Sequence, residues 1–360
     1  MKAFTLSLLG LLMTFGSIAQ SGVAFKKLTK GDDGLYYLDG KTYTGQSLLL
    51  WPSNNKKFQQ IDWVNGQIEG WFKSWYEDGK QDQIIEYKEG KRHGSYKSFY
   101  ENGAPEIQCN YSNGKLEGSY NSYYAGGAPK KRANYEQGEE EGEVILYFRN
   151  GKVQQRAHFH AGLPHGLTVS YDEDEVKRKE INYVNGFRHG KTIIYHASGK
   201  PGEVANYKNG LPDGELLVYN MQGRIMRSEE YKEGKLHGLS INYTMNGVKM
   251  EEKTFENGRL HGPYKLWKEN GLDTYGDYHN GKKHGPWVEN GTSDIGKNEG
   301  TYEQGKKHGH WKLGATNLFG KCEGDFNMDL KDGHWVYYHH NGKRDRSEEW
   351  DNGTLVSTGK

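Results

Sequence analysis

The sequence predicts an all-β fold, an elongated open solenoid of about 13 stacked β-hairpin repeats of 24 residues each. Three observations predict this fold. An aromatic residue returns every 24 positions, glycines follow it at fixed distances, and prolines avoid the middle of the segments between the glycines. A fixed period between about 20 and 50 residues is typical of repeat architectures. Local motifs are therefore interpreted within the repeat.

An aromatic residue, here called the anchor, defines each repeat, and other positions are counted from it. Glycines follow most anchors at positions three and seven, as Gly234 and Gly238 follow Tyr231. A second aromatic residue usually stands at position twelve, and a third glycine at position sixteen. The anchors, 24 residues apart except for one step of 23, are Trp63, Tyr87, Tyr111, Tyr135, Phe159, Tyr183, Tyr207, Tyr231, Phe255, Tyr278, Tyr302, Phe326 and Trp350.

Two segments of about eight residues in each repeat, such as "LSINYTMN" and "VKMEEKTF", are predicted to be strands. They are rich in aromatic and β-branched residues and are bounded by turn residues. The link through the third glycine reads "ENG", "RNG", "MNG" or "HNG", and Asn-Gly favours a hairpin turn because both residues tolerate positive φ. We expect the hairpin turn there, with the longer link "YKEGKLHG" joining one hairpin to the next. A helix is disfavoured, because each glycine would cost it about 1 kcal/mol relative to alanine.

The composition argues against several classes of partner. The chain has 48 basic and 47 acidic residues, a net charge of +1, and a mean hydropathy of −0.97. A near-zero net charge disfavours a broad basic surface for nucleic acid. Hydrophobic residues make up only 34% of the chain, so stacked aromatic side chains, rather than a thick aliphatic core, are expected to supply much of the apolar burial.

The first nineteen residues differ from the rest of the chain. Residues 1–19 contain one lysine, an apolar run and small residues before a cleavage point, which is typical of a secretory signal peptide. The apolar run is shorter than the roughly 18 residues needed for a membrane span, and no later segment is apolar enough. We expect an exported chain, periplasmic, at the cell surface or extracellular, with an N-terminal cap and degenerate first repeat at residues 20–62 and the repeat array at residues 63–360.

The chain has two cysteines, Cys109 and Cys322. They lie about nine repeats apart, which corresponds to roughly 85 Å at two strands per repeat and ~4.8 Å per strand. A disulfide needs Cα atoms within about 7 Å of each other. We therefore expect no intramolecular disulfide.

The repeat phrases resemble a known family. "YKEGKRHGSYKSFYENGAPEI" and "FENGRLHGPYKLWKENG" are similar to MORN-type repeats, specifically the bacterial variant found in YwqK-family antitoxins, and the resemblance extends from about Tyr37 to the C-terminus. It implies an all-β array of hairpins that serves as an interaction scaffold without catalysis. An antitoxin of that kind acts inside the cell, whereas this chain has the features of an exported protein. We therefore carry over the fold and the scaffold role, and leave the toxin-neutralising role aside.

Position six is often histidine, as at His237, and otherwise glutamate or aspartate. All three carry an acceptor, so the position is predicted to satisfy backbone groups near the turn. An irregular cluster of His158, His160 and His165 leaves local metal binding open as an alternative. The other serines, acids and histidines recur with the repeat, and no catalytic set, cofactor or metal site is predicted.

Two classes of function remain open. The first is an exported scaffold that binds a protein or peptide, and the second is an envelope or surface structural protein that binds glycan. The candidate binding residues stand at position nine of the last repeats: Tyr264, Trp287, Trp311 and Trp335. If position twelve forms the core, strand alternation places these rings in an exposed row on the opposite face. The alternative is that the strands curl and bury both aromatic rows, or that a terminal cap covers the tryptophans.

Overall fold

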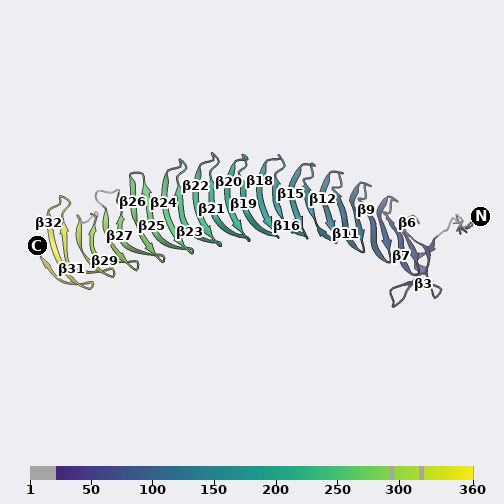
Figure 1. Ribbon diagram of the computed structural model, residues 1–360, viewed down its shortest axis with the longest axis horizontal. Helices are drawn as coiled ribbons and strands as arrows, with labels where there is room; N and C mark the ends of the chain where they lie inside the picture. The colour runs from purple at the N-terminus through teal and green to yellow at the C-terminus, as the bar shows by residue number, and fades with distance from the viewer. Residues whose placement is uncertain (1–21, 292–295, 316–319, 360) are drawn as a thin grey trace, which may run out of the picture. The chain divides into compact units, whose positions relative to one another are not determined.

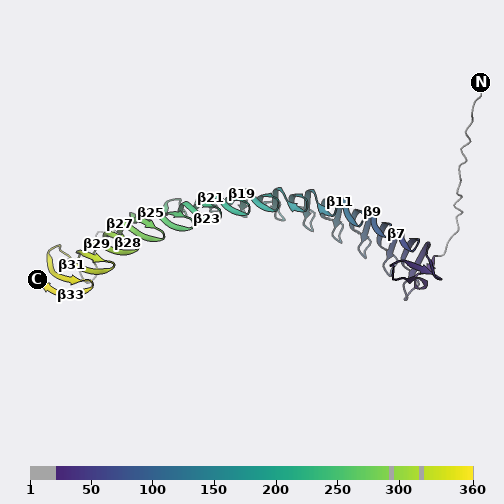
Figure 2. The ribbon, with the colours of Figure 1, turned by 60° about the horizontal axis from the view of Figure 1, so that its bottom comes forward.

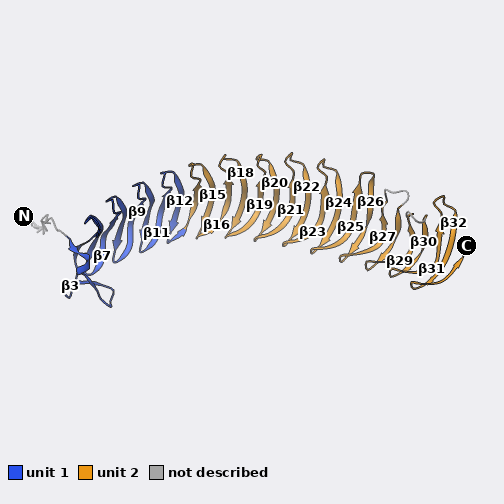
Figure 3. Ribbon diagram, turned by 180° about the vertical axis from the view of Figure 1, so that it is seen from behind, with its two compact units in different colours: residues 1–139 blue, residues 140–360 orange. Residues whose placement is uncertain are grey.

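The computed structural model describes residues 22–291, 296–315 and 320–359, so the predicted signal peptide lies outside the described residues. The chain divides into two compact units, residues 1–139 and 140–360 (Figure 3). Within each unit the long strands pair antiparallel with their neighbours along the chain (Figure 1). The predicted all-β fold of hairpin repeats is therefore confirmed.

Unit 1 begins with short elements and continues with long strands. Its elements are β1 (Val23–Ala24), the 3-10 helix η1 (Phe25–Lys27), β2 (Thr29–Lys30), β3 (Tyr36–Leu38), β4 (Lys41–Thr42), β5 (Gly45–Leu50), β6 (Lys57–Val64), β7 (Gln67–Trp75), β8 (Gln81–Lys88), β9 (Lys91–Phe99), β10 (Pro105–Ser112), β11 (Lys115–Tyr123) and β12 (Pro129–Glu136), and β13 (Glu139–Glu140) contains the division between the units.

The first anchor, Trp63, is covered by the segments that precede it. β1 pairs parallel with β5, with Val23 opposite Ser47, while β2, β3 and β4 form a separate small sheet. Trp63 is buried with Tyr43, its ring centroid lies 4.5 Å from that of Tyr36, and its Nε1 donates a hydrogen bond of 2.7 Å to Ser47 Oγ. This aromatic cluster shields the first repeat from solvent on the side that no earlier repeat covers.

Unit 2 consists of long strands that succeed one another in chain order (Figure 2). They are β14 (Gly142–Tyr147), β15 (Val153–His160), β16 (Leu163–Pro164), β17 (Gly166–Tyr171), β18 (Lys177–Val184), β19 (Phe187–Tyr195), β20 (Pro201–Lys208), β21 (Leu211–Tyr219), β22 (Ile225–Lys232), β23 (Lys235–Tyr243), β24 (Lys249–Glu256), β25 (Arg259–Lys268), β26 (Gly271–His279), β27 (Lys282–Glu289), β28 (Asn298–Glu303), β29 (Lys306–Leu313), β30 (Cys322–Asn327), β31 (Leu330–Tyr338), β32 (Arg344–Asp351) and β33 (Thr354–Gly359).

Both links of the repeat are hairpin turns. Directly after the anchor, a two-residue turn such as Glu89-Gly90 has φ of 50° and 72°, as a type I′ turn requires. In the third-glycine link only the glycine is left-handed: Gly103 has φ of 87° and donates its N–H to the carbonyl of Tyr100, whereas Asn102 does not have positive φ. The predicted positive φ of both residues in that link is wrong, because a longer loop closes this hairpin, while the two-residue turn lies in the other link.

The core follows a row of paired positions near the middle of the strands. Position −2, two residues before the anchor, pairs with position nine, as Ile85 pairs with Tyr96 and Ala205 with Leu216. Ile85 and Ala205 are buried, whereas the position-twelve ring of Phe99 is only half-buried. The prediction that position twelve forms the shared core is therefore wrong. The strand register shifts between positions eleven and twelve, so strict alternation of faces does not extend from position nine to position twelve.

Candidate functional site

The sequence-predicted binding residues form a buried column in unit 2, on β25, β27, β29 and β31. Trp287, Trp311 and Trp335 are 1%, 0% and 0% exposed, and Tyr264 is half-buried. Neighbouring rings enclose them: the centroid of Trp311 lies 5.0 Å from that of Tyr302, and burial raises the pKa of Tyr264 to about 12. The expected exposed row is thus wrong, and since a partner cannot reach buried indoles, we no longer assign them to binding.

Glycines explain how a single sheet buries three indoles. At position −2 these repeats have Gly276, Gly300 and Gly324, where most earlier repeats have isoleucine, alanine or cysteine. A Cβ on Gly300 would lie only 2.1 Å from Cδ2 of Trp311, so the ring occupies the space that a side chain would fill. The indole Nε1 of Trp311 also donates a hydrogen bond to the backbone. The joint appearance of glycine at position −2 and tryptophan at position nine is a sequence signal for this packing.

A lysine at position five covers each indole of the column. The Nζ of Lys283 lies 4.3 Å from the ring centroid of Trp287, and the Nζ of Lys307 and Lys331 each lie 4.6 Å from their tryptophans. An ammonium over an aromatic face contributes about 0.5–2 kcal/mol, most where it is shielded from water. The column therefore presents three ammonium groups at its solvent side.

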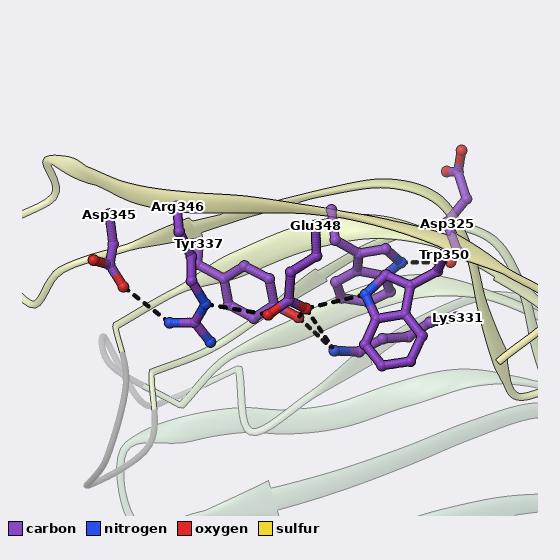
Figure 4. A network of polar contacts seen from close by, with 8 residues as sticks. Asp325, Lys331, Tyr337, Asp345, Arg346, Glu348 and Trp350 are labelled. Carbon is purple, nitrogen blue, oxygen red and sulfur yellow. Dashed lines mark hydrogen bonds and ion pairs between the residues drawn. The ribbon is translucent and has the colours of Figure 1, made fainter. Parts of the chain in front are cut away.

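The last ammonium of the column belongs to a polar network (Figure 4). Glu348 is its centre: it accepts hydrogen bonds of 2.5 Å from Tyr337, 3.0 Å from Trp350 Nε1 and 3.1 Å from Arg346 Nε. The Nζ of Lys331 lies 3.9 Å from the same carboxylate. Burial raises the pKa of Glu348, but these hydrogen bonds lower it by more, so its pKa is below the usual range. The network keeps an ionised carboxylate next to the lysine.

A cavity lies beside the column at the ends of β29 and β30, where the repeat pattern is irregular between Asn290 and Phe319. Its volume is about 720 Å³. Basic and apolar side chains share its wall, including Lys297, Lys312, Leu313, Lys321 and Cys322. Lys297 pairs with Glu299 at 2.8 Å, whereas Lys312 and Lys321 have no ion pair with any described residue. The cavity therefore has unneutralised positive charge.

An exposed apolar row lies on a different part of unit 2, at position four beside the type I′ turns. We define the apolar row as Leu163, Phe187 and Leu211, which are 49%, 61% and 52% exposed. Each side chain covers the turn of the following repeat: a Cβ on Gly210 would lie 3.4 Å from Cδ1 of Phe187. The sequence prediction missed this row because it considered aromatic periodicity, whereas the row is defined by apolar residues at a position that is usually charged.

Position six has the structural role that the sequence predicts. Its carboxylates accept a hydrogen bond from the backbone N–H of the next type I′ turn, as Glu117 does from Gln137 at 2.9 Å and Asp213 from Glu233 at 3.1 Å. His237 occupies the same position, yet its Nδ1 is buried without a hydrogen-bond partner among the described residues. Histidine therefore fills the position but satisfies the turn less well than a carboxylate does.

The remaining candidates show no shared ligand site. His160 contacts Glu141 at 3.1 Å, and its ring centroid lies 6.0 Å from that of His165. Across the described ranges, no group of three or more His, Cys, Asp or Glu side chains is placed to hold a metal ion. Cys109 is buried and Cys322 is half-buried, and both are free thiols. No helix in the described parts of the chain has the length and hydrophobicity needed to cross a bilayer.

These features define a β-hairpin repeat protein, and the comparisons give its class. Three segments, residues 92–113, 140–161 and 188–209, match the MORN repeat variant family. Each segment begins five residues after one anchor and ends two residues after the next, so the family unit has the register of the structural repeat. The chain therefore contains MORN variant repeats. No curated protein matches the chain at a significant level.

Solved structures with similarity to the chain belong to large toxin assemblies. They are a Photorhabdus luminescens Tc holotoxin pore (12% identity, 90% of this chain, 18% of that chain, TM-score 0.14), a TcdB2–TccC3–Cdc42 complex (10%, 85%, 22%, 0.14) and a TcdB2–TccC3 complex (12%, 92%, 17%, 0.14). The chain thus spans about a fifth of the length of these chains. At such TM-scores we draw no conclusion from them.

Proposed function

We propose that the chain is an exported, non-catalytic repeat scaffold that binds a protein partner, and that the partner places an amphipathic helix along the apolar row. The observation that carries the proposal is the exposure of Leu163, Phe187 and Leu211 in three consecutive repeats. Contiguous exposed apolar side chains on a soluble protein are typical of interaction sites. Export rests on residues 1–19, and the absence of catalysis rests on the repetition of the polar side chains.

The spacing of the apolar row selects a helix over an extended strand. Side chains at the same position of successive repeats are two strands apart, which is about 9.6 Å. In a helix, residues seven apart are about 10.5 Å apart on nearly the same face. In an extended strand, residues on one face recur at about 6.7 Å, and no small multiple of that distance fits. The mismatch for a helix is about 0.9 Å per repeat, so three apolar side chains can be matched in register.

The charge beyond the apolar row indicates an acidic helix. In the four following repeats, position four is basic and exposed: Lys235, Arg259, Lys282 and Lys306. None of these four has an ion pair with a described residue. A partner helix whose apolar heptads are followed by glutamate or aspartate would complement both the row and its basic continuation, and complementary charge adds specificity and association rate.

Photo-cross-linking in native envelope extracts tests this proposal. A photoreactive phenylalanine analogue replaces Phe187 in one sample and the equally exposed Met245, on the opposite edge of the sheet, in the other. We expect adducts from position 187 alone, and the cross-linked peptide should have apolar residues every seven positions with acidic residues beside them. Phe187→Asp should abolish capture, and Met245→Ser should leave it unchanged. Equal adducts at both positions, or a captured segment without apolar heptads, would refute the proposal.

A further inference from the structure

The three position-five lysines offer an internal comparison, because they share one geometry. The Nζ of each lies over the indole of its own strand and over an anchor ring of a neighbouring strand. For Lys307 these rings are Trp311 at 4.6 Å and Phe326 at 5.3 Å. Any difference between the three sites therefore comes from what else surrounds the ammonium.

The first and third lysines have a carboxylate within the chain. Lys283 Nζ lies 2.5 Å from Glu289 Oε1, and Lys331 Nζ lies 3.9 Å from Glu348 Oε2 and also donates to the hydroxyl of Tyr337. Glu289 occupies position eleven of its repeat, and Glu348 occupies position −2 of the next anchor. A lysine at position five can thus reach a carboxylate at either position.

Lys307 has neither carboxylate. Position eleven of its repeat is Leu313, and position −2 of the next anchor is Gly324. Among the described residues no carboxylate lies within ion-pair distance of Lys307 Nζ, and the nearby Asp329 accepts a hydrogen bond of 2.7 Å from the backbone N–H of Lys307 instead. A half-buried ammonium over two rings has lost part of its hydration, and an ion-pair partner restores what it lost.

The surroundings of Lys307 lead to the basic cavity. Leu313 and Cys322 pair across β29 and β30 and form part of the wall of the cavity of about 720 Å³. Because Lys283 reaches position eleven in its own repeat, Lys307 has the length to reach the Leu313 end of the cavity. At the rim, the unpaired Lys312 and Lys321 would favour a ligand with several negative charges.

We propose that Lys307 and this cavity bind a carboxylate-bearing ligand, with the ligand's carboxylate in the place that Glu289 and Glu348 occupy in the adjacent repeats. Lys307 supplies the charge and the hydrogen-bond donors, Trp311 and Phe326 hold the ammonium in position, and Lys312 and Lys321 attract further carboxylates. Acidic peptides and uronate glycans share this chemistry. The site is separate from the apolar row and does not depend on the helix-binding proposal.

Two defined probes distinguish the sources of the carboxylate: a hexaglutamate peptide and trigalacturonic acid, with hexaglutamine as the uncharged control. Calorimetric titration of the full mature chain should show binding of at least one acidic probe, weakening as salt is added, and no binding of hexaglutamine. Binding of one probe alone would identify the ligand as peptide or glycan, and equal binding would show recognition of the carboxylate itself.

The variants test the site independently of folding. Lys307→Met should weaken binding by at least tenfold, and the matched change Lys283→Met should leave it within about twofold, since Lys283 already has a partner. Leu313→Glu rebuilds the arrangement of the first repeat, so it should keep the fold, as checked by circular dichroism, and still block the acidic probe. Absence of binding by both probes, or unchanged affinity in Leu313→Glu, would overturn the proposal.

Discussion

Substitution of Gly300 by alanine tests the packing of the tryptophan column most directly. The new Cβ would lie 2.1 Å from Cδ2 and 2.3 Å from Cε2 of Trp311, where ordinary contacts begin near 3.4 Å. The indole is fully buried between Tyr302 and Phe326 and its Nε1 is bonded to the carbonyl of Thr301, so it has no room to move away. Overpacking of this kind costs about 1–3 kcal/mol. Removing a glycine from the unfolded chain returns about 0.4–1 kcal/mol, which leaves a net loss of about 1–2 kcal/mol.

Hydrogen exchange measures this loss locally, which is preferable because repeat arrays need not unfold in one step. A loss of about 1–2 kcal/mol corresponds to roughly 5- to 30-fold faster exchange in β27 to β30. Gly126→Ala is the matched control: Gly126 has no positive φ and no atom near its Cβ position, so exchange there should stay equal or slow. The double variant Gly300→Ala with Trp311→Leu should lose less than the sum of its single variants. Unchanged protection in Gly300→Ala would refute the packing described for the column.

Three further predictions follow from the polar contacts. His237→Glu should stabilise the turn of the following repeat by about 0.5–1.5 kcal/mol, and Asp213→Ala should destabilise its own target turn by a similar amount, both measured as exchange at the turn amides. Because the pKa of Glu348 is lowered in the folded state, its stabilising contribution is present above about pH 4.3 and is lost as the pH falls through the folded pKa; the acid sensitivity of exchange in β31 and β32 should therefore decrease in Glu348→Gln. Burial raises the pKa of Cys109 to about 11, so maleimide at pH 8 should label it only after denaturation, and rapid labelling of the native chain would contradict its burial.

The hairpin repeat could be predicted because its signals are local. Aromatic anchors and glycines recur with a fixed period, and each turn needs left-handed residues at set places, as at Glu89 and Gly90. The assignment of the tight turn to the third-glycine link was wrong, because Asn-Gly also suits the longer loop, where Gly103 alone has positive φ. Turn type depends on how many residues the two strands leave unpaired, and that number follows from their register rather than from a dipeptide.

The face on which the tryptophans lie could not be obtained by alternation. Counting from position nine to position twelve assumes an unbroken pleat, but the register shifts between positions eleven and twelve reverse the parity. Gly276, Gly300 and Gly324 carried the missing information, because an indole packs closely onto a glycine and not onto isoleucine. The carboxylate-free environment of Lys307 likewise depends on which side chains converge from separate strands, which no single stretch of sequence states.

The side chains at position six give the chain a direction. Each carboxylate serves a turn twenty residues downstream, as Glu69 does for the N–H of Glu89 and Asp332 for that of Asn352, so a repeat depends on the one before it for part of its closure. Trimming repeats from the C-terminal end leaves every remaining turn with its acceptor and merely idles one carboxylate. Trimming from the N-terminal end strands the first remaining turn. A lesion at position six should accordingly loosen a neighbour rather than its own repeat, and the array should tolerate shortening better from one end than from the other.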